Sequence, residues 1–319
     1  MKILITGICG FVGGYLSRCL ARAGHVVCGT RLEGERVPDF LRDTEIHVLD
    51  LTQKDAVGDV LRESEPDAVC HLAAQSSVAL SWRDPAQTWE VNVIGLIHLL
   101  EGIRAMDSNP RILLIGSSEE YGKVTPEEIP LREDHSLRPG NPYAAGKAAQ
   151  EMLGRLYAEA YGMDIIMVRA FNHTGPGQAP TFVIPDFAKR IAAMEKGQMP
   201  KELLVGNLEV VRDFSDVRDI VRGYAMLLEQ GRAGEVYNIG SGQGYSIRDL
   251  LQRLLAMTVE AIAVSRDPAR MRPSDVPVLI GDIRKITDHT GWKPEIPMDT
   301  TLRDVLEDWR QNDGLPGRK

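Results

Sequence analysis

The sequence predicts an α/β protein built on a doubly wound parallel sheet, with a smaller second domain interleaved into its C-terminal half. In the first half, short β-branched runs alternate with longer segments whose apolar residues recur every three or four positions. The strand-like runs are apolar at consecutive positions, which is typical of parallel strands covered on both faces. After about Phe171 this alternation is interrupted and resumes only in part, so we expect the second domain there.

Buried strands and amphipathic helices are expected to alternate through the first half. The expected strands are Lys2–Thr6, His25–Gly29, Ile46–Asp50, Asp67–Leu72, Arg111–Ser117 and Asp164–Arg169. The expected helices are Phe11–Gly24, Gln53–Glu63, Trp89–Met106 and Tyr143–Tyr161. Residues 1–171 would form the first domain.

The second half mixes elements of both domains. A stretch rich in Gly, Pro and Thr, Asn172–Pro185, is expected to be irregular. The segments expected to follow are helices Phe187–Lys196 and Val217–Gln230, strand Glu235–Ile239, and two further elements at Ser246–Ala256 and Ala261–Val264. We therefore expect residues of about 208–240 to complete the first domain, and residues 172–207 and 241–319 to form the second.

Charge and cysteine content narrow the class of protein. The 319 residues include 37 Lys+Arg and 45 Asp+Glu, a formal charge of −8, which argues against nucleic acid or an anionic membrane as the main partner. Because an apolar run starts at Lys2, we expect no signal peptide, and because no apolar stretch is long enough to span a bilayer, we expect no transmembrane segment. The four cysteines, Cys9, Cys19, Cys28 and Cys70, form no CxxC pair. We expect reduced, buried thiols in a cytoplasmic protein and no metal site.

A glycine-rich turn directly follows the first expected strand. Gly7, Gly10 and Gly13 have GxxGxxG spacing and lead into the first helix. Three glycines can simply form a turn, but glycines between a strand and a helix also let the backbone approach a pyrophosphate at the helix N-terminus. The sequence therefore predicts a Rossmann-type dinucleotide-binding domain.

The end of the second strand bears on which dinucleotide is bound. An acidic residue there would bind the ribose hydroxyls of NAD, whereas this chain has Thr30 and Arg31. A guanidinium suits the 2′-phosphate of NADP in charge and in bidentate geometry. NADP is therefore expected. NAD stays possible, because Glu33 or Glu35 could reach the ribose and Arg31 could be a solvated surface residue.

Three polar residues, one after a strand and two on a helix, could carry acid–base chemistry. Tyr143 and Lys147 are four residues apart on an expected helix, so both side chains lie on one face. A nearby ammonium is expected to lower the pKa of the phenol and make it a usable acid or base. Ser117 follows the fifth strand, where α/β sheets bind ligands, although a serine there can also simply cap a helix.

Together these residues resemble the extended short-chain dehydrogenases/reductases over nearly the whole chain. The resemblance also includes His71-Leu72-Ala73-Ala74 and Asn92. Three later motifs are similar to the nucleotide-sugar branch of that family: Phe171-Asn172-His173-Thr174-Gly175-Pro176-Gly177-Gln178, Arg212-Asp213-Phe214-Ser215-Asp216-Val217-Arg218-Asp219, and Arg272-Pro273-Ser274-Asp275. Within that branch, the resemblance implies a reductase that acts on a GDP-linked 4-keto-6-deoxy sugar and forms GDP-D-rhamnose.

The resemblance also implies a role for individual residues. The second domain would bind the nucleotide sugar. Residues implied in binding NADP are Gly7, Gly10, Phe11, Val12, Gly13, Thr30, Arg31, Asp50, Leu51, Leu72, Ala73, Ala74, Tyr143 and Lys147. Residues implied in binding the substrate are Ser118, Glu119, Asn172, Lys189, Arg212, Arg272 and Asp275. Residues implied in catalysis are Ser117, Glu119, Tyr143 and Lys147, with Tyr143 protonating the C4 oxygen.

Other functions stay open. Glu119 keeps an acid where GDP-mannose 4,6-dehydratases of this family have one, so elimination chemistry is an alternative. A nucleotide-sugar 4-epimerase would use the same Ser117, Tyr143 and Lys147, and a non-catalytic NADP-binding sensor would usually have lost them. The resemblance further implies a homodimer formed through the helices Trp89–Met106 and Ala148–Tyr161, although both faces could instead cover the sheet.

Overall fold

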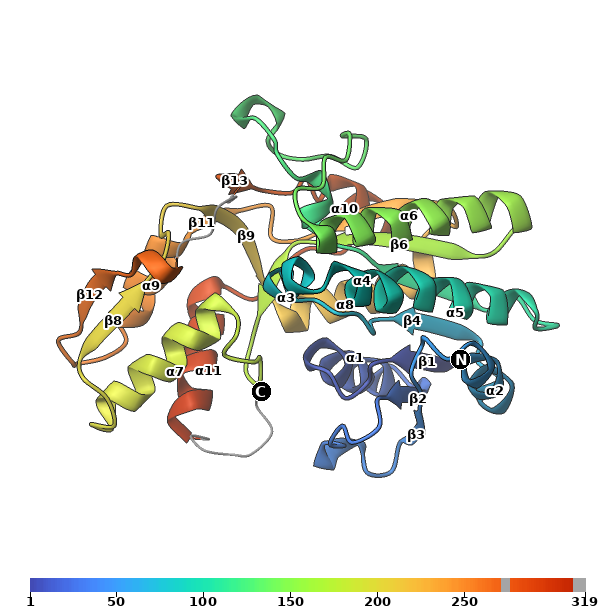
Figure 1. The fold of residues 1–319 in the computed structure, drawn as a ribbon, viewed down its shortest axis with the longest axis horizontal. Helices are drawn as coiled ribbons and strands as arrows, with labels where there is room; N and C mark the ends of the chain where they lie inside the picture. The colour runs from blue at the N-terminus through green and yellow to red at the C-terminus, as the bar shows by residue number, and fades with distance from the viewer. Residues whose placement is uncertain (271–275, 312–319) are drawn as a thin grey trace.

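A seven-stranded parallel sheet forms the centre of the computed structural model, which describes residues 1–270 and 276–311 (Figure 1). The strand order is β3-β2-β1-β4-β5-β6-β10, and every neighbouring pair is parallel. The strands are β1 (Lys2–Thr6), β2 (Val26–Arg31), β3 (Glu45–Val48), β4 (Ala68–His71), β5 (Arg111–Ile115), β6 (Ile165–Ala170) and β10 (Val236–Ile239). The predicted doubly wound sheet is confirmed.

Helices cover both faces of this sheet. Ile3 and Ile5 of β1 pack with α1 and α8, whereas Leu4 between them packs with α2 and α5 on the opposite face. Side chains alternate between faces along a strand, so burial on both sides requires the uninterrupted apolar runs of the sequence. The helices on the first face are α1 (Phe11–Arg22), α8 (Val217–Gln230) and α10 (Arg284–Thr290), and those on the second are α2 (Lys54–Ser64), α5 (Gly95–Arg104) and α6 (Pro142–Tyr161).

Most elements of the sheet domain differ from their predicted bounds by one or two residues, and two of the differences change the description of the structure. β2 continues through Arg31, so Thr30 and Arg31 belong to the strand. The expected helix Trp89–Met106 starts earlier, as α4 (Pro85–Trp89), because the Asp84 carboxylate accepts the Gln87 amide and proline fits the first helical turn. A π-helical turn, Glu90–Ile94, then joins α4 to α5, and the short helix α3 (Val78–Arg83) precedes them.

A second lobe carries its own apolar core, at the left of Figure 1. Its helices are α7 (Val183–Glu195), α9 (Ile247–Leu255) and α11 (Met298–Gln311). Its strands form two sheets, one of β7 (Asn172–Thr174), β9 (Val211–Asp216), β11 (Gly244–Ser246) and β13 (Val278–Leu279), the other of β8 (Glu202–Val205) and β12 (Ala263–Arg266). The segment expected to be irregular therefore contains β7 and the start of α7.

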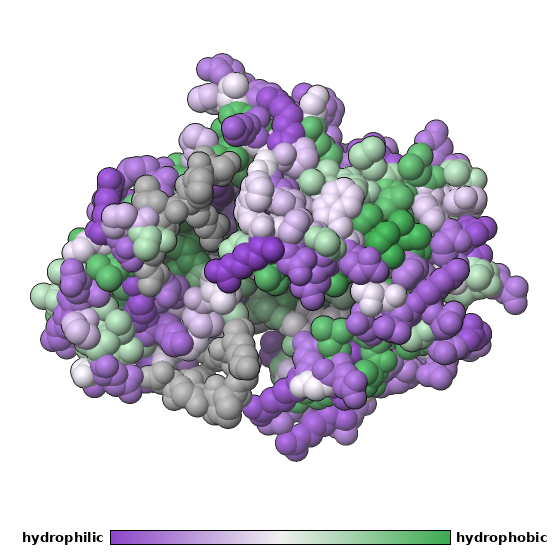
Figure 2. Space-filling view, in the orientation of Figure 1, coloured by the Kyte–Doolittle hydropathy of each residue, from purple (hydrophilic) through white to green (hydrophobic). Residues whose placement is uncertain are grey.

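Polar contacts join the two lobes. The Arg218 guanidinium of α8, in the sheet domain, donates to the Asp304 carboxylate of α11, in the second lobe, at 2.7 Å. The indole of Trp292, fully buried beside α8, donates to the Asp219 carbonyl at 3.0 Å. The last part of the described chain thus packs against the sheet domain as well as the second lobe, and Figure 2 shows the surface hollowed between the two.

The structure also tests the expectations about the cysteines and about membrane-spanning segments. All four cysteines are free thiols. Cys28 and Cys70 are buried, as expected. Cys9 and Cys19 are half-exposed, because Cys9 lies in the glycine turn and Cys19 lies on a partly exposed side of α1. Within residues 1–270 and 276–311, no helix combines the length and the apolar character that a membrane span requires.

Candidate active site

The glycine turn between β1 and α1 has a backbone that side chains would disrupt. Gly7 has a φ of +72°, and a Cβ atom there would lie 3.2 Å from the Ala73 Cα atom. A Cβ atom on Gly13 would lie 2.4 Å from the Gly7 carbonyl oxygen. Gly10 is the N-cap of α1, and no described side chain caps this helix. Its first amides are therefore left for an anion, as a pyrophosphate site requires.

Thr30 and Arg31 flank this turn at the end of β2. The buried Thr30 hydroxyl accepts the Gly7 amide at 3.3 Å, so Thr30 supports the turn itself. The Arg31 guanidinium donates to the carbonyls of Leu32 and Glu35, at 3.0 and 3.3 Å. The Glu35 carboxylate in turn accepts the Leu32 amide at 3.1 Å. Arg31 thus lies beside a small loop and is half-exposed. Burial raises the pKa of the Cys9 thiol in the glycine turn, and the charge of Arg31 opposes this larger effect.

The ends of β1 and β4 are tied together by one hydroxyl. Thr6 Oγ1 accepts the amides of Leu72 and Ala73, each at 3.1 Å, and contacts His71 Nδ1 at 3.0 Å. This holds Ala73 against Gly7, and its neighbours Leu72 and Ala74 are half-buried. His71 is fully buried, and burial lowers its pKa to about 3, with the Lys147 charge acting in the same direction.

Asp50 and Leu51 follow β3, farther along the same edge of the sheet. The exposed Asp50 carboxylate accepts both the amide and the hydroxyl of Thr52, at 3.0 and 2.8 Å. Leu51 is buried against α5, where its carbonyl contacts the His98 ring. Their contact with a bound adenine stays a prediction.

Ser117, Tyr143 and Lys147 come together where β5 ends and α6 begins. Ser117 follows β5, and α6 starts with Asn141 as N-cap, whose side chain accepts the Ala144 amide at 2.8 Å. Lys147 Nζ donates to the Ile115 carbonyl at 2.7 Å, so the ammonium is anchored to the end of β5. A side-chain hydrogen bond joins Ser117 and Tyr143. All three residues are at least nine-tenths buried.

Protonation of this group differs from the expectation. Lys147 was expected to lower the pKa of Tyr143, but burial raises that pKa instead, opposed by the Ser117 hydrogen bond and assisted by Glu120 and Glu119. Burial also lowers the pKa of Lys147 to about 8. The cause is the loss of solvation for the charged forms, the phenolate and the ammonium. Tyr143 therefore stays protonated across the neutral range, which suits a group that donates a proton.

The two glutamates after Ser117 have different surroundings. Glu119 is half-buried, and its carboxylate accepts the Asn141 side-chain amide at 3.3 Å. Glu120 is fully buried, and its carboxylate accepts the Ser117 amide at 2.6 Å. Ser118, between Ser117 and Glu119, is buried as well. Glu120 was not predicted as a site residue, although the spacing Ser117-x-x-Glu120 is the capping-box signature that would have revealed its contact with Ser117.

The residues implied in substrate binding lie on the second lobe and its connection. Asn172 starts β7 and is half-buried. Arg212 of β9 is buried, and its guanidinium donates to the carbonyls of Val276 and Val211. Lys189 is exposed on α7, with its ammonium 5.5 Å from the centre of the Trp309 ring. Arg272 and Asp275 lie outside the described residues.

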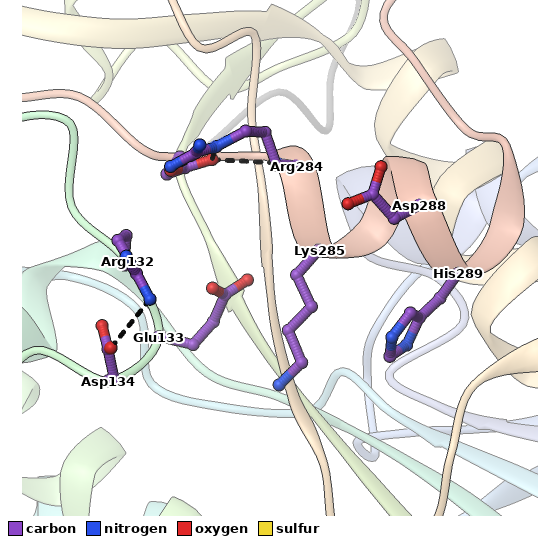
Figure 3. A pocket seen from close by; sticks show the side chains of 8 residues that line it. Arg132, Glu133, Asp134, Arg284, Lys285, Asp288 and His289 are labelled. Atoms are coloured by element: carbon purple, nitrogen blue, oxygen red, sulfur yellow. Dashed lines mark hydrogen bonds and ion pairs between the residues drawn. The ribbon is translucent and has the colours of Figure 1, made fainter.

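A polar groove of about 430 Å³ lies away from these residues, along the outer edge of β10. In Figure 3, Arg132, Glu133 and Asp134 face Arg284, Lys285 and other side chains of α10. Glu133 accepts the Asn238 amide at 2.8 Å, and Lys285 donates to the Val236 carbonyl at 2.6 Å. These charged residues satisfy the open edge of the sheet. Within the described ranges, no cluster of His, Cys, Asp and Glu could hold a metal ion.

Comparison with known proteins shows what the chain resembles. Residues 4–305 match the GDP-mannose 4,6 dehydratase family. The chain is 38% identical to GDP-6-deoxy-D-mannose reductase of Pseudomonas aeruginosa over 308 residues, which cover 97% of each chain. It is 30% identical to GDP-mannose 4,6-dehydratase of Vibrio cholerae, with 96% of this chain and 93% of the relative covered.

Solved structures of similar proteins have the same fold as this chain. The structure of RMD from Pseudomonas aeruginosa complexed with NADPH superposes with a TM-score of 0.87 at 36% identity, covering 97% of this chain and 99% of the other. UDP-glucose 4-epimerase of Thermotoga maritima with UDP-glucose gives a TM-score of 0.88 at 28% identity, covering 98% and 99%. Reductases and epimerases of nucleotide sugars therefore share this fold.

Proposed function

This chain belongs to the GDP-mannose 4,6-dehydratase family, and we propose that within the family it is a reductase. It reduces the C4 keto group of GDP-4-dehydro-6-deoxy-D-mannose to give GDP-D-rhamnose, using NADPH. The observation that carries the proposal is the 38% identity, over nearly both whole chains, to a GDP-6-deoxy-D-mannose reductase, against 30% to a dehydratase. The protonated Tyr143 beside Lys147 agrees with it, because a ketone reduction consumes a proton.

The residues of the glycine turn fit a dinucleotide. The uncapped first turn of α1 and the glycines that a Cβ atom would crowd make room for a pyrophosphate, held by Gly7, Gly10, Phe11, Val12 and Gly13. When bound, NADPH supplies the hydride. Arg31 binds its 2′-phosphate, and its guanidinium exchanges the Leu32 and Glu35 carbonyls for that anion. NAD remains the weaker alternative.

Tyr143, Lys147 and Ser117 divide the proton chemistry among them. Tyr143 donates its phenolic proton to the C4 oxygen as charge develops there. The Ser117 hydroxyl accepts the Glu119 amide at 3.2 Å and donates its one proton to the same C4 oxygen, which polarises the carbonyl. Lys147, anchored on the Ile115 carbonyl, keeps a positive charge beside the phenol, so the phenolate left behind is stabilised.

The substrate is held between the two lobes in this proposal. Ser118 and Glu119 border the sugar, and Asn172, Lys189 and Arg212 bind the GDP moiety, with the guanidinium against the diphosphate. Arg272 and Asp275 complete this set from the segment that the structure does not describe. The hollow between the lobes supports this placement (Figure 2). We also propose that residues 1–171, completed by about 208–240, bind the cofactor and that residues 172–207 and 241–319 bind the nucleotide sugar.

A homodimer and a cytoplasmic location complete the proposal. Trp82, Trp89, Met152 and Leu156 expose apolar surface on the neighbouring helices α3, α4 and α6, between 42% and 61% of each residue. Figure 2 shows apolar side chains at the surface over α6. A second copy of the chain could cover this face in a two-fold dimer. Four free cysteines fit a reducing compartment.

The same family membership keeps the dehydratase as a second candidate. Glu119 places a carboxylate beside Asn141 at the start of α6, where an elimination would need one. The two functions are separated by incubating the protein with GDP-mannose alone, and separately with GDP-4-dehydro-6-deoxy-D-mannose plus NADPH, and identifying the products by NMR. We expect GDP-D-rhamnose from the second mixture alone. Conversion of GDP-mannose without added reductant would make the protein a dehydratase.

A further inference from the structure

A fully buried carboxylate with an unsatisfied oxygen lies directly behind the proposed catalytic residues. Glu120 is 0% exposed, and one of its oxygens accepts the Ser117 amide at 2.6 Å. Its other oxygen is buried and has no hydrogen-bond partner among the described residues. Such a group is costly to bury, so its presence calls for a compensating interaction or a protonated state.

Glu120 and Lys147 are anchored to consecutive peptide groups at the end of β5. Lys147 donates to the Ile115 carbonyl, on the N-terminal side of Gly116, and Glu120 accepts the Ser117 amide on its C-terminal side. A Cβ atom on Gly116 would lie 2.4 Å from the Glu120 carboxylate, so glycine gives the carboxylate its place. Burial raises the pKa of Glu120, while the two charges of opposite sign stabilise each other.

Two other charged residues near Glu120 are paired with each other. Glu151 of α6 and Arg169 of β6 form a buried ion pair, with contacts of 2.7 and 2.8 Å between the guanidinium and the two carboxylate oxygens. Glu151 raises the pKa of Glu120, and Arg169 and Lys147 lower it. Arg169 is already paired with Glu151, which leaves Lys147 as the cation near Glu120 whose charge the Glu120 carboxylate can neutralise.

We propose that Glu120 is a positioning residue for the reduction: it anchors the main chain of Ser117 and places a carboxyl group near the buried ammonium of Lys147, which is anchored on the neighbouring peptide group. The first role keeps the Ser117 hydroxyl directed at Tyr143. The second keeps the ammonium charged to a higher pH than its burial would allow. The effect on turnover rests on the proposed reductase function, whereas the effect on Lys147 is a property of the chain alone.

Two substitutions separate these roles. Glu120→Gln keeps an acceptor for the Ser117 amide but removes the negative charge. Glu120→Met fills the same space and removes both the acceptor and the charge. Loss of the charge lowers the pKa of Lys147, so the basic limb of the kcat–pH profile should move about one pH unit toward acid in both variants. The plateau of kcat should stay within about threefold in the Gln variant and fall about tenfold in the Met variant, because Ser117 then loses its anchor.

Nitrogen-15 NMR of the Lys147 side chain in cofactor-free protein gives a readout independent of turnover. The Lys147 titration should move to lower pH in both variants, and in the unsubstituted protein it should share its midpoints with the Glu120 carboxyl, observed through carbon-13. Glu133→Gln is the matched control: Glu133 also accepts a main-chain amide and has a pKa raised by burial, but it lines the groove beside β10. That variant should leave the Lys147 titration unchanged.

Independent titrations of Lys147 and Glu120 in the unsubstituted protein, or an unmoved Lys147 titration in folded Glu120 variants, would overturn the assignment. A shifted Lys147 titration in a protein that does not reduce the sugar would leave the role of Glu120 standing and reject the reductase function.

Discussion

Tyr143 is the residue on which the proposed chemistry depends most. Its phenol is buried, hydrogen-bonded to Ser117 and held protonated because burial disfavours the phenolate. A phenol that is protonated across the neutral range donates its proton when negative charge develops on an atom next to it. The C4 oxygen of a ketone that is being reduced is such an atom.

Tyr143→Phe removes the proton donor and keeps the ring. We expect kcat for the reduction to fall about 100-fold or more, with the dissociation constants of NADPH and of the nucleotide sugar changed less than about threefold. Single-turnover kinetics with NADPH fluorescence measures both quantities. Near-normal turnover in this variant would show that the proton comes from another group.

Arg31 is expected to select the cofactor. Arg31→Ala should weaken NADPH binding at least about tenfold and leave NADH binding unchanged, because NADH lacks the 2′-phosphate that the guanidinium binds. Titration calorimetry with both cofactors measures this ratio. The control is Arg42→Ala, which removes an exposed arginine paired with Asp39. Equal losses for NADPH and NADH would contradict the role of Arg31.

Single residues were predictable from sequence where their spacing carries chemistry. Ser117, Tyr143 and Lys147 were expected at strand and helix ends, and the structure brings them together. The protonation of Tyr143 was not predictable, because it depends on how deeply the phenol is buried. Glu120 was missed because glutamate is rarely buried: the Ser117-x-x-Glu120 spacing indicates the contact with the Ser117 amide, but it does not indicate that the carboxylate is buried.

At the scale of elements, the glycine turn positions the cofactor site. Gly13 stands in the first turn of α1, where the Gly7 carbonyl leaves no space for a side chain. The first turn of α1 must stay packed against the Gly7 carbonyl for the N-terminus of the helix to face the glycine turn.

Gly13→Ala should move α1 away from β1. We expect the free energy of unfolding to fall by about 1–3 kcal/mol and NADPH affinity to fall at least about tenfold. Thermal unfolding and fluorescence titration measure the two effects. Gly58→Ala in α2 is the matched control, because only the mobile end of Arg62 lies near the added Cβ atom and alanine favours a helix. A Gly13→Ala protein with unchanged affinity would contradict the close approach.

Element types followed from periodicity, while their ends depended on local contacts. The strands of the sheet were expected because both faces are apolar, and they lie within a few residues of their expected positions. The early start of α4 came from the Asp84 cap and Pro85, which the apolar pattern does not report. The π-helical turn at Glu90–Ile94 was not expected either; the Gln150 side chain donates to the Asn92 carbonyl within it, a contact between distant segments.

At the scale of the whole molecule, the two lobes act as one unit. Asp219 of α8 accepts the amides of Glu295 and Ile296, and Arg218 of α8 donates to Asp304 of α11, which fixes the second lobe against the sheet domain. The existence of the second lobe was predictable from the interrupted alternation after Phe171. Its small strands were not, because β7, β11 and β13 are too short to carry a periodic pattern.

The exposed apolar face of α3, α4 and α6 is proposed to lie between two copies of the chain. The double variant Met152→Glu and Leu156→Glu places charges on that face and should convert a dimer to a monomer, because burying an unpaired carboxylate is unfavourable. Sedimentation equilibrium measures the mass. Val264→Glu, an exposed apolar position on β12, should leave the mass unchanged. A mass of one chain before any substitution would reject the dimer.

The most direct test of the central claim follows a deuterium label from cofactor to sugar. The protein is incubated with GDP-4-dehydro-6-deoxy-D-mannose and NADPH carrying deuterium at C4 of the nicotinamide, with each face labelled in turn. NMR of the product should show one deuterium at C4 of a 6-deoxyhexose for one of the two labels, with one NADPH oxidised per sugar. Absence of deuterium at C4 with both labels, or turnover of GDP-mannose with no NADPH consumed, would contradict the account.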